Sequence, residues 1–284
     1  MSTRTSDPGL SRGRRISVRV LAGLGLVTYS LLFAFVAAET SGIVTSSPVG
    51  SPDDPLPSPE ALAGAAAPGE AVHLVGALGV LALGASGLIA LLLGPHRLGA
   101  SRQVLAAVLA FLVAVPIVGN PDNVGGQAGA VDPVLLVLGV PPLLAALVAG
   151  PFRAVGSDPL RPLPLILAAV AIPIAASWGV GQALNQRNTF PPTADPHHQA
   201  HWQAMAVFAF AVVLVLAAAA FAGSGWRLGA TMAGMCAMAF GVTTIVAPTA
   251  ASAAEPIWAV AALVWGVAVL YAAWSDKPRA DGRR

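Results

Sequence analysis

Residues 72–100 read VHLVGALGVLALGASGLIALLLGPHRLGA, and this stretch decides the fold class. Its first part, residues 72–94, contains no Asp, Glu, Lys or Arg. About 20 apolar residues are enough for a helix to cross the hydrocarbon core of a bilayer. A proline, a histidine and an arginine follow at once, where the chain is expected to leave the membrane. The stretch therefore predicts a membrane-spanning helix followed by a short polar connection.

The composition of the whole chain agrees with this prediction. Of 284 residues, 56% are hydrophobic and 10% are charged, whereas a soluble domain carries about 25% charged residues. We therefore expect an all-α, multi-pass membrane protein whose main partner is the lipid bilayer. Charge is too sparse for a nucleic-acid-binding face. The single cysteine, Cys236, excludes an internal disulfide and a cysteine-rich metal site.

Eight segments are long and apolar enough to be predicted as transmembrane helices. They are residues 16–38, 72–94, 102–119, 131–150, 160–183, 201–222, 228–248 and 256–274. The first is too long for the apolar core of a signal peptide, so we expect it to remain as a span. Residues 1–15 and 275–284 are then polar tails.

The distribution of basic residues predicts the orientation. With the N-terminus in the cytoplasm and eight alternating spans, every Lys and Arg except Arg187 falls on the cytoplasmic side. Acidic residues gather in the predicted outer loops instead. They are Glu39, Asp53, Asp54, Glu60, Glu70, Asp122, Asp132, Asp195 and Glu255. Both termini are therefore expected to be cytoplasmic, in a protein of the plasma membrane.

An internal repeat is indicated by RLGA, which occurs at 97–100 and again at 227–230. Alignment at these residues gives two halves with the same order of spans and loops. Each half has a long outer loop before its second span, at 39–71 and at 184–200. We expect residues 16–153 and 154–274 to form two parallel four-helix repeats, related by a pseudo-twofold axis along the membrane normal.

The segment with the most distinctive chemistry is residues 193–204, TADPHHQAHWQA. Helical spacing places both His197 and His198 on a face shared with His201, which suits one metal ion. The equivalent place in the first half offers Glu70 and His73. Packing of the halves about a twofold axis would bring the two sets together at the extracytoplasmic surface. The predicted metal ligands are Glu70, His73, Asp195, His197, His198 and His201.

Imidazole and carboxylate ligands suit copper, zinc and iron, including haem iron. Arg187, the one basic residue expected outside, would bind an anionic group such as a haem propionate, or equally Asp195. The competing interpretation is a solvated polar helix start with a structural or pH-sensing role. Trp202 fits that interpretation, because tryptophan is frequent at the membrane–water boundary.

The layout resembles the heme A synthase family. Glu70-x-x-His73 matches the ExxH of that family at the second span, and His201 matches the histidine expected at the sixth. The resemblance implies two four-helix halves and places His73 and His201 where the family has haem-binding histidines, so haem b is a candidate cofactor at the outer face. The sequence departs from the family pattern in spans 131–150 and 256–274, which contain no histidine. The second haem ligand of each half therefore has no counterpart.

Three functional hypotheses follow. The first is a membrane protein for redox chemistry or metal handling, with its metal or haem site at the outer face. The second is a transporter for a metal or a small solute. Ion-coupled transporters usually have a charged residue in the middle of a span, and the predicted spans have none there. The third is a non-catalytic accessory subunit that binds other membrane subunits. No nucleophile–base pair, phosphate loop or nucleotide motif is visible, so no catalytic residue is assigned.

Overall fold

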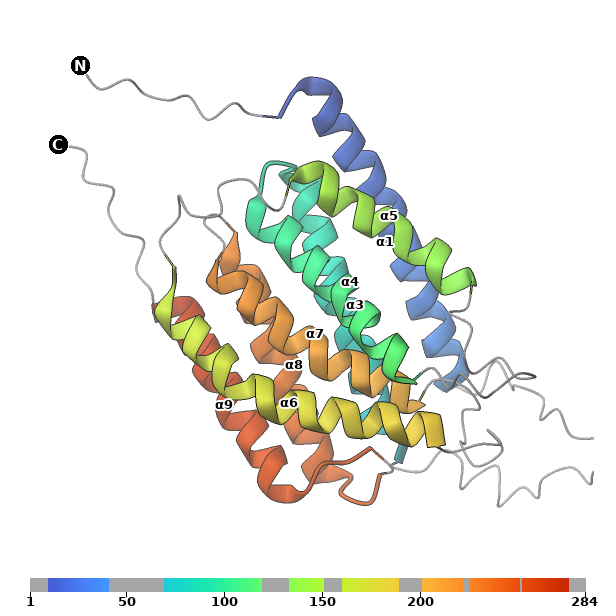
Figure 1. Ribbon diagram of the computed structural model, residues 1–284, viewed down its shortest axis with the longest axis vertical. Coiled ribbons are helices and arrows are strands. Elements are labelled where there is room, and N and C mark those ends of the chain that lie inside the picture. Colours follow the sequence, from blue (N-terminus) through green and yellow to red (C-terminus); the bar gives the residue numbers. More distant parts are fainter. Residues whose placement is uncertain are drawn as a thin grey trace, which may run out of the picture.

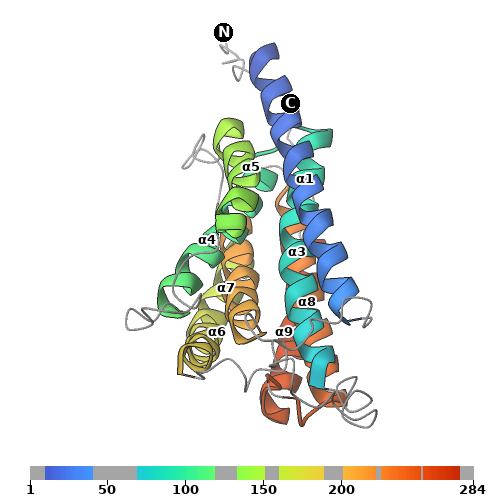
Figure 2. The same ribbon diagram turned by 90° about the vertical axis from the view of Figure 1, so that its right-hand side faces the viewer.

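A computed structural model describes residues 10–40, 69–118, 133–150, 160–188, 201–221, 225–250 and 252–275. Throughout these ranges the regular secondary structure is α-helix, and the helices form one elongated bundle (Figures 1 and 2). The prediction of an all-α fold is confirmed.

Each predicted span contains one helix. The helices are α1 (Arg12–Thr40), α3 (Gly69–Leu93), α4 (Leu98–Val118), α5 (Pro133–Ala149), α6 (Pro162–Asn188), α7 (His201–Ala220), α8 (Trp226–Val246) and α9 (Pro256–Ser275). Helix α1 begins four residues before its predicted span. The Arg14 N–H there donates to Ser11 Oγ at 3.4 Å, and a serine oxygen of this kind satisfies a backbone donor at a helix start.

Six of these helices are long and apolar enough to cross a membrane: α1, α3, α6, α7, α8 and α9. In α4 and α5 the apolar parts identified in the described residues are shorter, Leu98–Ala114 and Gly139–Ala149. Two prolines, Pro141 and Pro142, lie inside α5, as neighbouring helices allow in a membrane bundle. A multi-pass membrane protein is therefore supported, while the full count of eight spans stays a prediction.

The centre of the bundle consists of α3, α4, α7 and α8. Helix α3 packs against the other three, and α4 packs against α7. Helices α1 and α5 lie together beside α3 and α4, while α6 and α9 lie beside α7 and α8 (Figure 1). In the apolar window of α7, 72% of residues are buried, against 28% in α1 and 17% in α6. The outer helices therefore present most of their apolar side chains outward, as lipid contact requires.

Small residues bring α8 and α9 together. A Cβ added at Gly241 would lie 2.6 Å from the Ala259 carbonyl oxygen, and one at Gly234 would lie 2.9 Å from the Gly266 oxygen. The two contacts are seven residues apart on each helix, so they lie on one face of each. Close backbone approach at small residues is a common way for helices to associate in membranes, where apolar burial alone provides little driving force.

The described arginines other than Arg187 gather at one end of the bundle, and several of them bind the ends of helices. Arg19 Nε donates to the Leu92 oxygen at 3.2 Å. Arg14 donates to the Val148 oxygen. The last carbonyls of a helix lack intrahelical donors and carry partial negative charge. These arginines therefore stabilise the ends of α3 and α5 while concentrating positive charge at one end of the molecule.

Candidate functional site

The second turn of α3 and the first turn of α7 lie side by side at the end of the bundle opposite Arg14, Arg19 and Arg97. Gly76 packs directly against Met205, so that a side chain at position 76 would collide with the Met205 sulfur. Met205 is fully buried. The glycine thus allows the two helices to approach closely about two turns into α3 and one turn into α7.

This contact fixes the relative register of the predicted histidine positions. Position 73 precedes Gly76 by three residues, and position 201 precedes Met205 by four. Residues three or four apart share one face of a helix. The backbones of His73 and His201 therefore stand at the start of neighbouring helices, on the faces that meet one turn further along. Glu70 stands three residues before His73, in the first turn of α3.

Asp195, His197 and His198 lie outside the described residues. Arg187 is in the last turn of α6, which packs against α7. The structure does not describe the side chains of Glu70, His73, Arg187 and His201. Among the side chains that it does describe, no group of three His, Cys, Asp or Glu residues is close enough to hold a metal. The metal prediction therefore stays untested.

A buried polar side chain lies near the same end. Gln182 of α6 is 7% exposed, and its Oε1 has no hydrogen-bond partner among the described groups. Gly179, one turn earlier, packs against Ala209 of α7. Because α6 and α7 run antiparallel, Gln182 lies level with the first turns of α7. A buried acceptor of this kind needs a donor, and an imidazole N–H or a bound water would supply one.

Aromatic rings fill the bundle below this level. Trp178 and Phe240 meet edge to face with their centroids 5.1 Å apart, and Phe208 lies 5.7 Å from Phe240. The three rings come from α6, α7 and α8. Sequence reasoning missed this cluster, because single aromatic residues in three separate apolar runs give no pattern. The cluster packs α6, α7 and α8 against one another.

No protein family, curated protein or solved structure matches the chain. Known proteins therefore neither support nor contradict the resemblance to heme A synthases, which depends on the layout and on Glu70, His73 and His201.

Proposed function

We propose that this is an integral membrane protein that binds a transition-metal ion where α3 and α7 begin. The observation that carries the proposal is the contact between Gly76 and Met205. It aligns the starts of two helices that belong to different halves of the chain, and each start carries a histidine. A histidine from each half, with Glu70 beside one of them, is a ligand set suited to copper, zinc or iron.

The segment before α7 completes the proposed site. Asp195, His197 and His198 precede His201 by only a few residues, so they are within reach of an ion held by that residue. Gln182 would accept a hydrogen bond from a ligating imidazole, which is the usual way in which surrounding groups orient metal ligands. Arg187 would hold an anion at the rim. A single ion needs less space than a haem between helices that approach as closely as α3 and α7 do at Gly76.

We also propose the predicted topology: eight spans in two parallel repeats, cytoplasmic termini and the metal site outside. Two observations support the repeat. In the proposed repeat α3 corresponds to α7, and α4 corresponds to α8. The contact between α3 and α8 therefore corresponds to a contact between α7 and α4, and both contacts are present. The two RLGA loops also meet, since a Cβ at Gly225 would lie 3.9 Å from the Arg97 Cβ and 4.0 Å from the Ala100 nitrogen. The arginine-rich end supports the orientation through the positive-inside rule.

The test is elemental analysis and an absorption spectrum on the same detergent-purified sample. We expect about one copper, zinc or iron per chain, lost in His73→Ala and in His201→Ala. His96→Ala is the matched control, because His96 lies in the turn between α3 and α4, at the opposite end of the bundle. A Soret band that is lost in the same variants would show that the bound group is a haem and not a single ion. A colourless, metal-free protein, or metal that persists in both site variants, would refute the proposal.

A further inference from the structure

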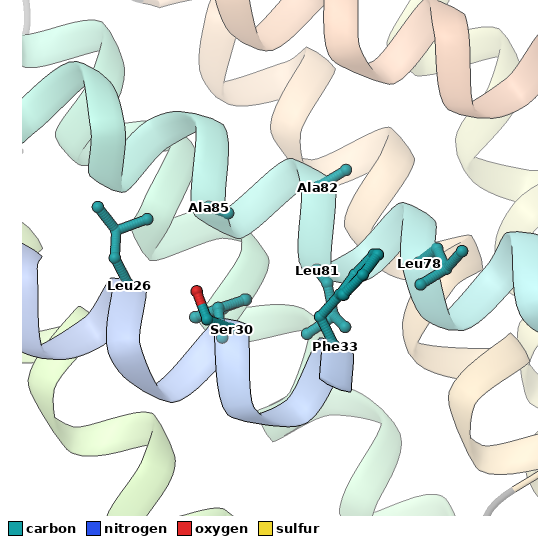
Figure 3. A pocket seen from close by; sticks show the side chains of 8 residues that line it. Leu26, Ser30, Phe33, Leu78, Leu81, Ala82 and Ala85 are labelled. Carbon is teal, nitrogen blue, oxygen red and sulfur yellow. The ribbon is translucent and has the colours of Figure 1, made fainter. Parts of the chain in front are cut away.

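Two depressions lie along one side of α1. The first, of about 480 Å³, is at the start of the helix and is lined by Arg12, Arg15, Ile16 and Arg19. The second, of about 260 Å³, lies between α1 and α3. Its lining includes Leu26, Ser30 and Phe33 from α1 and Leu78, Ala82 and Ala85 from α3 (Figure 3). One depression is basic, and the other is almost wholly apolar.

The two depressions share one face of α1. Arg12, Arg19, Leu26 and Phe33 follow one another at intervals of seven residues, which is close to two helical turns. Gly23 lies on the same face between Arg19 and Leu26, and no atom lies within 4 Å of a Cβ added there. Open space therefore continues from the arginines to the apolar groove.

Helix α3 forms the other wall. Ile89 and Leu92 continue the face of Ala82 and Ala85 toward the arginines, and they are 47% and 36% exposed. The hydrogen bond from Arg19 to the Leu92 oxygen ties the two walls together at the basic end. At 1.5 Å per residue, Leu26 lies about 10 Å and Phe33 about 21 Å beyond Arg19 along the helix. One leaflet of the hydrocarbon core is about 15 Å thick, so the groove has the depth of an acyl chain.

From this geometry we propose that the α1–α3 groove binds an anionic phospholipid. Its phosphate lies among Arg12, Arg15 and Arg19, because guanidinium groups form strong, charge-assisted hydrogen bonds with phosphate. One acyl chain lies in the space left by Gly23, Ala82 and Ala85, with Phe33 at its far end. The inference depends on insertion of the helices into a bilayer and is independent of the metal site.

The experiment is a native mass spectrometry titration of the delipidated, full-length protein in detergent. The probes are phosphatidylglycerol, phosphatidylcholine with the same acyl chains, and inorganic phosphate as a competitor. We expect one phosphatidylglycerol to bind about tenfold more tightly than phosphatidylcholine, since each basic residue near the surface attracts anionic lipid appreciably. Equal affinity for the two lipids would overturn the proposal.

Two variants test the two parts of the site. The triple substitution R12Q/R15Q/R19Q removes the basic part, and we expect the preference for phosphatidylglycerol to disappear. Its control is R279Q/R283Q/R284Q, which removes the same charge from the C-terminal tail and leaves the preference intact. We expect Ala85→Leu to fill the groove and to weaken the binding of both lipids several-fold. Its control is Ala261→Leu, on an exposed face of α9, which should leave both affinities unchanged.

The remaining outcomes are also decisive. If Ala85→Leu binds phosphatidylglycerol like the wild type while inorganic phosphate competes fully, the arginines hold a free anion and the lipid proposal is wrong. If the tail control loses the preference as completely as the triple variant, the binding reflects overall charge, and the proposal is again wrong. Circular dichroism and gel filtration of each variant confirm that it folds. Metal content is measured separately, so failure of one proposal leaves the other open to its own test.

Discussion

The substitution Gly241→Ala tests whether close backbone approach holds α8 against α9. The new Cβ would lie 2.6 Å from the Ala259 oxygen and 3.1 Å from the Leu263 nitrogen. Both obstacles are backbone atoms, so no side-chain rotation relieves the contact. Ordinary contact begins at 3.4 Å, so the helices must separate locally by about 0.8 Å, the difference between 3.4 and 2.6 Å.

The expected cost follows from this displacement. Gaps of about 0.5–1 Å forfeit a quarter to a half of the dispersion energy at each contact. Overpacking of a tight interior typically costs about 1–3 kcal/mol. Alanine also gains about 1 kcal/mol over glycine in helix propensity, which offsets part of the loss. We therefore expect Gly241→Ala to lower the free energy of unfolding by up to about 2 kcal/mol, with the backbone obstacles favouring the larger loss.

A second glycine isolates the packing contribution. Gly181 of α6 has no atom within 4 Å of an added Cβ, so Gly181→Ala gains propensity without a clash. The difference between the two variants should equal the overpacking cost, about 1–3 kcal/mol. The assay is SDS-induced unfolding in mixed micelles, followed by circular dichroism. If Gly241→Ala is as stable as Gly181→Ala, the close approach of α8 and α9 contributes nothing measurable, and the reasoning is refuted.

Three further predictions concern other contacts. A Cβ at Gly84 would lie 2.5 Å from Tyr29 Cζ, so Gly84→Ala should destabilise the packing of α1 by about 1–3 kcal/mol. Tyr29→Ala should then lower the free energy of unfolding less in the Gly84→Ala background than in the wild type. If the two losses of stability are strictly additive in a double-mutant cycle, the contact is contradicted. Cys236 is buried, so a maleimide should label it slowly until SDS unfolds the protein; fast labelling of the folded protein would place the thiol at the surface. The Arg161 guanidinium lies 4.3 Å from the Trp226 ring centroid, so Trp226→Leu should cost about 1 kcal/mol beyond the lost packing, measured as coupling with Arg161→Gln.

The positions of the helices could be predicted from the sequence because long apolar runs have few alternatives in a bilayer. Residues 256–274 were predicted as a span, and α9 is Pro256–Ser275. The arrangement of the helices could not be predicted in the same way. Helices α6 and α7 are both strongly apolar, yet 17% of one window and 72% of the other are buried. Lipid and protein interior are equally apolar, so hydropathy does not distinguish an outer helix from a central one.

The candidate site was predictable only in part, for a related reason. Alignment of the two halves at RLGA predicts that His73 and His201 occupy corresponding places. The contact that aligns them involves Gly76 and Met205, and neither residue stands out in an apolar run rich in glycine. Gln182 was visible as a polar residue near the end of a span, but its burial depends on the way α6 packs against α7. Polar residues can be read from a sequence, whereas the register of two packed helices cannot.

The repeat hypothesis allows the groove between α1 and α3 to be compared with the corresponding interface of the second half. Exchange of the halves places α6 and α7 where α1 and α3 stand. At that equivalent interface the helices pack closely, since a Cβ at Gly179 would lie 3.1 Å from the Ala209 Cβ. Helices α1 and α3 also pack closely on one side, since a Cβ at Gly84 would lie 2.5 Å from Tyr29 Cζ. On the other side Gly23 faces open space, and three arginines line the depression next to it. Gly181 of α6 also has no atom within 4 Å of an added Cβ, so open space beside an outer helix occurs in both halves. The three arginines beside Gly23 are therefore the feature on which the proposal of an anionic lipid depends.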